Sequence, residues 1–119
     1  IYQRLACLAA QTLANGYPVI VDATHLKQAQ RQLMRDAIED QGAPCLILHC
    51  DAPQASIEQW LSERQQAGTD ISDAGIEVMR HQLQEMEPLD ADEAALSIRV
   101  DTASETAMSD LSEQLKKRL

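Results

Sequence analysis

Residues 18–22 read Pro-Val-Ile-Val-Asp, and residues 44–50 read Pro-Cys-Leu-Ile-Leu-His-Cys. Both stretches are short and apolar, and the first is β-branched without polar alternation. Continuous apolar runs of this length are typical of strands covered on both faces, as the central strands of parallel sheets are. The two stretches therefore predict two strands of a mostly parallel sheet.

Apolar residues recur at helical spacing between these strands and on either side of them. Helices are predicted at 1–14, 27–41, 53–68, 73–86 and after a Thr-x-x-Glu capping box at 102–105. A third short strand is expected at 96–100, and the acidic, proline-containing stretch 85–93 is expected to be an exposed loop. Because strands and helices alternate, the pattern predicts a three-layer α/β/α fold in one domain over residues 1–119.

The composition and the net charge argue against several classes of function. With 119 residues and 45% apolar residues, the chain can fill one core. No apolar run approaches the roughly 20 residues of a membrane-spanning helix. The net charge of −9 repels nucleic-acid backbones, although a few arginines can still hold one phosphate cluster. The three cysteines form no CxxC pair, so we interpret Cys45 and Cys50 as core residues of a cytoplasmic protein.

Asp22 is the first candidate for chemistry, because it is the last residue of the predicted strand 18–22, with Thr24 two residues beyond it. Ligands of α/β domains bind beyond the carboxyl ends of the strands. A carboxylate in that place can hold a magnesium-bound water or accept a proton from a substrate hydroxyl. The alternative is that Asp22 or Thr24 caps the next helix. The residues alone leave both interpretations open.

Arg64 is the second candidate. It lies on the same predicted helix face as Ile57, Trp60 and Leu61. Its aliphatic stem can cover these apolar residues, or its guanidinium can reach inward to a phosphate. The spacing alone leaves both interpretations open as well.

Short motifs spread over most of the chain resemble one family by their order and spacing. They are Val19-Ile-Val-Asp22-Ala-Thr24-His-Leu-Lys27, Arg31, Arg35, Glu63-Arg64, Asp70, Asp73, Gln82, Glu87-Pro-Leu89, Glu93 and Val100-Asp101-Thr102. They resemble the P-loop ATP-binding, kinase-like domains of the AAA type that are fused to aminoglycoside-phosphotransferase-like domains. These domains are distantly similar to polynucleotide kinases and zeta toxins.

The resemblance implies a P-loop NTPase-like fold and a phosphotransferase or ATPase that uses ATP and Mg²⁺. Asp22 would lie at the end of a Walker B-like strand and contact Mg²⁺ indirectly, with Thr24 beside it. Arg64 would face the phosphates from lid helices at about residues 53–86. Arg31 and Arg35 would line the substrate side.

One family motif is missing, because no Gly-x-x-x-x-Gly-Lys-Ser/Thr occurs in the sequence. We therefore expect residues 1–119 to be the C-terminal portion of an N-terminally truncated P-loop domain. Such a portion would be inactive alone, and its partner would be the missing portion of the same domain. The alternative, from another class, is a non-catalytic interaction domain that keeps the fold and forms a homodimer through an exposed sheet edge.

Overall fold

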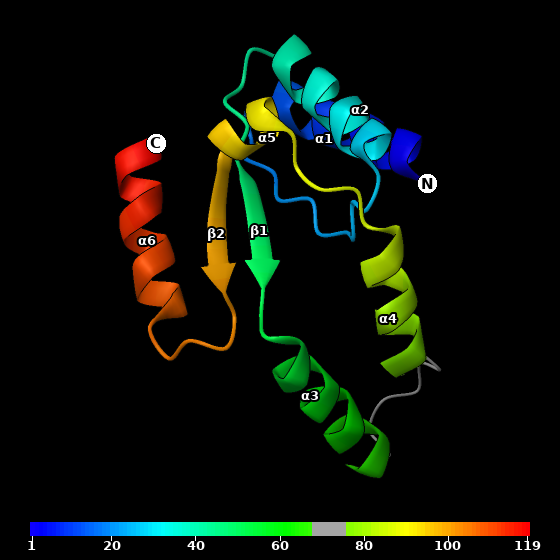
Figure 1. Ribbon diagram of the computed structural model, residues 1–119. Coiled ribbons are helices and arrows are strands. Elements are labelled where there is room, and N and C mark those ends of the chain that lie inside the picture. Colours follow the sequence, from blue (N-terminus) through cyan, green and yellow to red (C-terminus); the bar gives the residue numbers. More distant parts are fainter. Residues whose placement is uncertain (68–75) are drawn as a thin grey trace.

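The computed structural model describes residues 1–67 and 76–119 and has an α/β architecture, with helices around a small parallel sheet (Figure 1). The elements are α1 (Tyr2–Ala14), α2 (Gln28–Asp40), β1 (Ile47–Asp51), α3 (Gln54–Ala67), α4 (Ile76–Glu85), α5 (Ala91–Ala95), β2 (Ser97–Asp101) and α6 (Ala107–Arg118). The predicted helix end at Gly68 and helix start at residue 73 lie outside the described residues. None of the helices in these ranges is long and apolar enough to cross a membrane.

The main apolar cluster lies between α1 and α2, which run side by side (Figure 1). Ala6, Ala9 and Met34 are buried at its centre. Small alanines on α1 let the two helices approach closely, and Met34 fills the space between them. This cluster fixes the two helices that flank residues 15–27, where the predicted site begins.

β1 and β2 pair in parallel, from Ile47 opposite Ser97 to Asp51 opposite Asp101. Side chains alternate between the two faces of a strand, and in β1 Leu48 and Cys50 are both exposed. The prediction that this strand is covered on both faces is therefore wrong, as is the core assignment of Cys50. Cys45 precedes the strand and is half-buried, and this burial raises the pKa of its thiol.

Residues 18–22 form no strand, which corrects the first sequence prediction. A strand requires a neighbour that pairs with its backbone N–H and C=O groups. Within the described residues, β1 pairs with β2 and the sheet has two strands. Val19 and Val21 still pack against the α1–α2 cluster, whereas Ile20 is 91% exposed. The stretch is thus covered on one side, and the three-layer arrangement stays a prediction.

Two further predictions from local patterns are corrected by long-range contacts. The stretch 85–93 is not exposed throughout, because α5 begins within it and Glu93 is 1% exposed. The last helix does not begin at the predicted capping box, since its N-cap is Thr106. Thr102 instead donates from its backbone N–H and its hydroxyl to the Asp51 carbonyl, at 2.8 and 3.1 Å. It ties the end of β2 to the end of β1.

Candidate functional site

Asp22 and Thr24 lie in residues 22–27, a connection before α2 that we call the Asp22 loop. Both residues are exposed. The N-cap of α2 is Lys27, and its backbone N–H donates to Gln30 Oε1 at 3.2 Å. The interpretation that Asp22 or Thr24 caps this helix is therefore wrong. A ligand can therefore reach both residues.

Tyr2 anchors the loop from α1. Its hydroxyl lies 3.1 Å from Thr24 Oγ1 and accepts a hydrogen bond from the His25 backbone N–H at 3.1 Å. The rings of Tyr2 and His25 meet edge to face, with centroids 5.1 Å apart. His25 has a φ of +46°, a conformation that costs a non-glycine residue about 1–3 kcal/mol. The contacts of Tyr2 help to hold this backbone turn directly after Thr24.

Arg31 anchors the loop from α2, and its side chain is 5% exposed. Nη1 donates to the carbonyls of His25 and Leu26 at 2.9 and 3.2 Å. Nη2 donates to the Pro88 carbonyl and to Glu93 Oε1, both at 3.2 Å, and Nε donates to Glu93 Oε2. A guanidinium has five N–H donors, and all five are used inside the protein. The contact of Arg31 with a substrate stays a prediction. In this structure the guanidinium binds the carbonyls of the loop and the carboxylate of Glu93.

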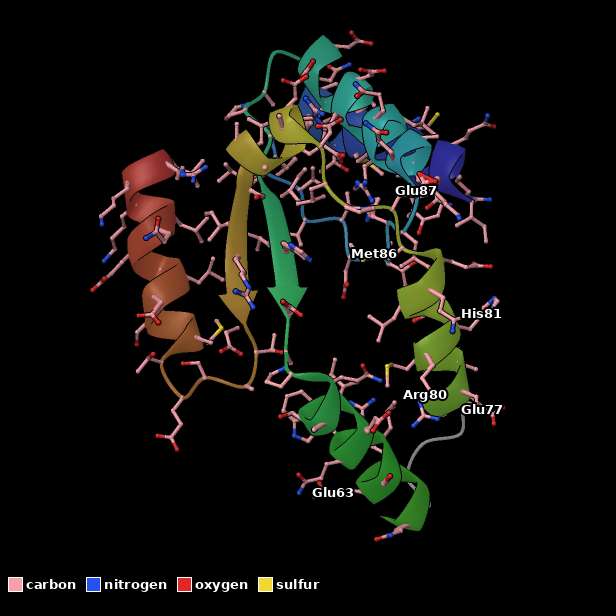
Figure 2. All side chains as sticks on the ribbon, in the orientation of Figure 1. Glu63, Glu77, Arg80, His81, Met86 and Glu87 are labelled. Atoms are coloured by element: carbon pink, nitrogen blue, oxygen red, sulfur yellow. The ribbon has the colours of Figure 1, made fainter. Side chains whose placement is uncertain are left out.

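A third anchor comes from residues 85–93, which we call the 85–93 segment. Lys27 Nζ donates to the Glu85 carbonyl at 3.2 Å. The Gln28 backbone N–H donates to Glu87 Oε1 at 2.8 Å, and the Glu87 N–H donates to the Leu26 carbonyl at 2.8 Å. Figure 2 shows Glu87 beside the start of α2, where a carboxylate is favoured by the helix dipole. The Asp22 loop is thus bound on three sides.

Arg35 lies one turn beyond Arg31 on α2, and its side chain is 13% exposed. Its guanidinium is 3.9 Å from Glu39, and within the described residues its buried Nε has no hydrogen-bond partner. Its charge acts on Cys45, where it opposes the rise in the pKa that burial causes. The contact of Arg35 with a substrate stays a prediction.

Arg64 is exposed in the last turn of α3. Arg80 on α4 donates to Glu58 on α3 at 2.9 Å, and this hydrogen bond lowers the pKa of Glu58. The Asp22 loop contacts the C-terminal end of α4, whereas the C-terminal end of α3 lies at the far end of the α3–α4 pair (Figure 1). This arrangement does not bring Arg64 and Asp22 together. The role of Arg64 on a lid stays a prediction.

The oxygen atoms of the Asp22 loop fit an indirect contact with Mg²⁺. Within the described ranges, no group of three or more His, Cys, Asp or Glu residues could hold a metal ion. Mg²⁺ does not need such a group, because it is usually held by one or two carboxylates together with water and phosphate oxygens. The carboxylate of Asp22 and the hydroxyl of Thr24 offer oxygen atoms to such a site, and both residues are exposed.

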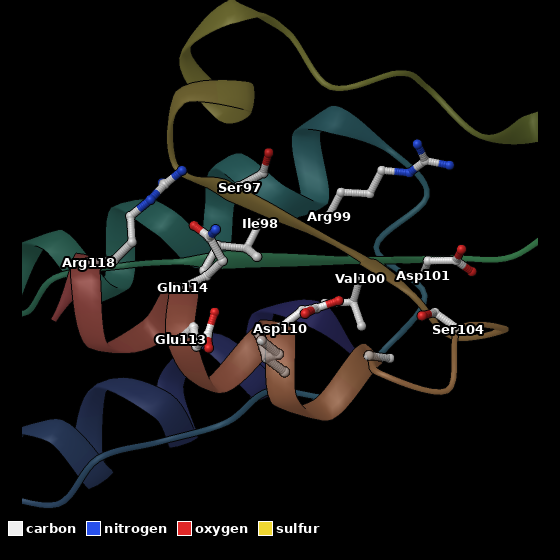
Figure 3. A pocket seen from close by; sticks show the side chains of 12 residues that line it. Ser97, Ile98, Arg99, Val100, Asp101, Ser104, Asp110, Glu113, Gln114 and Arg118 are labelled. Carbon is white, nitrogen blue, oxygen red and sulfur yellow. The ribbon is translucent and has the colours of Figure 1, made fainter.

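A separate open groove of about 570 Å³ lies between β2 and α6 (Figure 3). It contains none of the predicted site residues, and its floor includes the buried Ile98 and Val100. Two arginines line it, and both contact protein oxygens: Arg99 pairs with Asp51 at 3.0 Å, and Arg118 donates to the Ala95 carbonyl at 3.2 Å. We assign this groove no function.

The residues that hold the site are harder to find from sequence than those that form it. Nothing in the residue pattern distinguishes Tyr2 from its neighbours on α1. Glu87 and Glu93 belong to the family motifs, but their composition alone is that of a solvated acidic loop. The family resemblance is therefore the signal that marks them, and their partners become visible only in the fold.

Comparison with known proteins identifies one family. A family model described as an AAA domain matches residues 1–89 of the chain. No curated protein and no solved structure matches. The matched range includes the Asp22 loop, Arg31, Arg64 and Glu87, and it ends before Glu93.

Proposed function

Because this chain belongs to the AAA domain family, whose members are P-loop NTPase-like nucleotide-binding domains, we propose that it is part of an ATP-dependent phosphotransferase or ATPase. In this proposal Asp22 and Thr24 act next to the phosphates and Mg²⁺. α3 and α4, within residues 53–86, form the lid, from which Arg64 approaches the transferred group. The observation that carries the proposal is the exposed Asp22-Ala-Thr24 turn, held on three sides, within the matched family range.

The chemistry follows from what each side chain offers. Phosphoryl transfer depends mainly on positioning and on stabilising negative charge. Mg²⁺ would neutralise part of the phosphate charge, and Asp22 would hold a water of the metal or accept the proton of the attacking hydroxyl. Thr24 offers a hydroxyl beside it. Arg64 would add positive charge at the transferred group when the lid helices approach.

Mg-ATP is expected to bind residues 1–119 at best very weakly. The β- and γ-phosphates of P-loop proteins are held by the backbone amides and the lysine of a glycine-rich loop, and the sequence contains no such motif. Isothermal titration calorimetry with Mg-ATP measures this directly. Micromolar affinity would show that the nucleotide site lies elsewhere in the chain. Any weak binding that remains should fall in the Asp22→Asn variant only when Mg²⁺ is present.

A non-catalytic interaction domain is the second candidate, and a specific observation favours it. Tyr17, Ile20 and Leu48 are 67%, 91% and 42% exposed. Within the described residues, β1 has one paired edge, so its other edge offers free backbone groups. In this proposal a second copy of the chain covers these apolar groups and the open edge.

Residues 1–119 are expected to self-associate as their concentration rises, because apolar surface and an open sheet edge favour pairing. Sedimentation velocity over a wide concentration range measures this, with Ile20→Lys as the disrupting variant. Met108→Lys is a matched control, because Met108 is 75% exposed but lies on α6. A monodisperse monomer at every concentration would contradict the expectation. The interaction domain requires that this association occur without nucleotide.

A further inference from the structure

We propose that Arg31 is a positioning residue that fixes the Asp22 loop against the 85–93 segment, with Glu93 as its buried counterion. The inference rests on the proposed function, since it takes Asp22 and Thr24 as the working residues of this loop. Arg31 does not reach a ligand in this role. It acts through the backbone carbonyls of His25 and Leu26.

The guanidinium joins two parts of the chain that are distant in sequence, residues 25–31 and residues 88–93. It holds the carbonyls of His25 and Leu26 in the loop, the Pro88 carbonyl, and both carboxylate oxygens of Glu93, which is 62 residues away. Arg31 and Glu93 are 5% and 1% exposed, so water cannot take over these contacts. Loss of either partner would leave a buried charge unpaired, and loss of Arg31 would also remove the donors of the His25, Leu26 and Pro88 carbonyls.

The planar shape of the guanidinium matters as much as its charge. Lysine carries the same charge but has three donors at one point, and it cannot reach the same set of acceptors. Glu93 is fixed in turn by α5, since its carboxylate accepts from the Asp90 N–H at 3.3 Å and its own N–H donates to Asp90 Oδ1 at 2.8 Å. The loop is therefore attached to the capped start of α5.

Three backbone N–H groups report on this arrangement. Those of Gln28 and Glu87 donate to Glu87 and to Leu26, so each is protected only while the 85–93 segment stays in place. That of His25 donates to Tyr2, so it is protected only while the loop stays on α1. Hydrogen exchange measured by NMR gives the opening of each amide separately. Amides inside α1 and β2 report on the stability of the whole fold.

The test compares Arg31→Lys with Arg35→Lys, a matched variant on the same helix that contacts Glu39 only at 3.9 Å. In Arg31→Lys we expect the three reporter amides to exchange about tenfold faster or more, relative to any change in α1 and β2. We expect no such selective change in Arg35→Lys. Unchanged reporter amides in a folded Arg31→Lys protein would overturn the proposal. An equal rise in all amides would also overturn it, because Arg31 would then only stabilise the fold.

Glu93→Gln keeps the proposal testable if Arg31→Lys does not fold. Glutamine keeps one oxygen acceptor and removes the charge, so we expect a smaller rise, again confined to the reporter amides. An equal rise in the exchange rates of all amides, or no rise at the reporter amides, would overturn the proposal, as in Arg31→Lys. Asp22→Asn should leave all reporter amides unchanged. A failure of the proposed function would appear in nucleotide assays of Asp22→Asn, whereas a failure of the positioning role appears only in the exchange rates.

Discussion

Glu93→Ala is expected to lower the free energy of unfolding by about 3–5 kcal/mol, as removal of one partner from a buried ion pair typically does. The Glu93 side chain is 1% exposed, and its carboxylate receives two of the five donors of Arg31. Without it, a buried guanidinium loses its counterion, and α5 loses the side chain that receives the Asp90 N–H. Urea unfolding followed by circular dichroism measures the change.

Glu39→Ala is the matched control, because Glu39 is 55% exposed and lies 3.9 Å from Arg35. A pair of this kind contributes below about 1 kcal/mol. The double variant Arg31→Met/Glu93→Leu should recover only part of the loss, since the carbonyls of His25, Leu26 and Pro88 would still lack their donors. If Glu93→Ala were as mild as Glu39→Ala, the buried ion pair would not exist in solution.

Asp22→Asn in the full-length protein is expected to slow phosphoryl transfer by about 10²–10⁴-fold, the usual contribution of a general acid or base. Asparagine lacks the negative charge and is a poorer partner for Mg²⁺. Because Asp22 is exposed and does not cap α2, the melting temperature should hardly change, and the stability should stay within about 0.5 kcal/mol. Steady-state kinetics and thermal unfolding of the same preparation test both statements.

The Arg64→Ala variant, measured in the same assays, tests the role of the lid independently of the role of the Asp22 loop. A lid arginine at the transferred phosphate would cost about 10³-fold in rate on removal, against about 1 kcal/mol in stability for its packing stem. Loss of rate in Asp22→Asn alone would keep the role of Asp22 and remove that of Arg64. If both variants have the turnover rate and melting temperature of the unsubstituted protein, neither residue has the proposed role, although the family membership is unaffected.

Local patterns determined much of this fold. The helix predicted at 27–41 is observed at Gln28–Asp40, and the strand predicted at 96–100 is observed at Ser97–Asp101. Helical periodicity and short apolar runs reflect contacts that each element needs to bury one face, so they can be read within a window of about 11–18 residues. The Asp22-Ala-Thr24 sequence, the AAA family motifs and the lack of a glycine-rich motif in residues 1–119 are likewise properties of the sequence itself.

Only the tertiary structure decided how residues distant in sequence meet. The apolar stretch 18–22 has the local pattern of a strand, yet a strand must pair with a neighbouring strand. Within the described residues the sheet consists of β1 and β2 and does not include this stretch. Arg31 resembles a ligand-binding arginine, and Glu93 resembles a residue of an acidic loop. Their mutual burial shows that each is the partner of the other, because a charge is removed from water only where a partner compensates it. That partner lies 62 residues away, so no local pattern contains it.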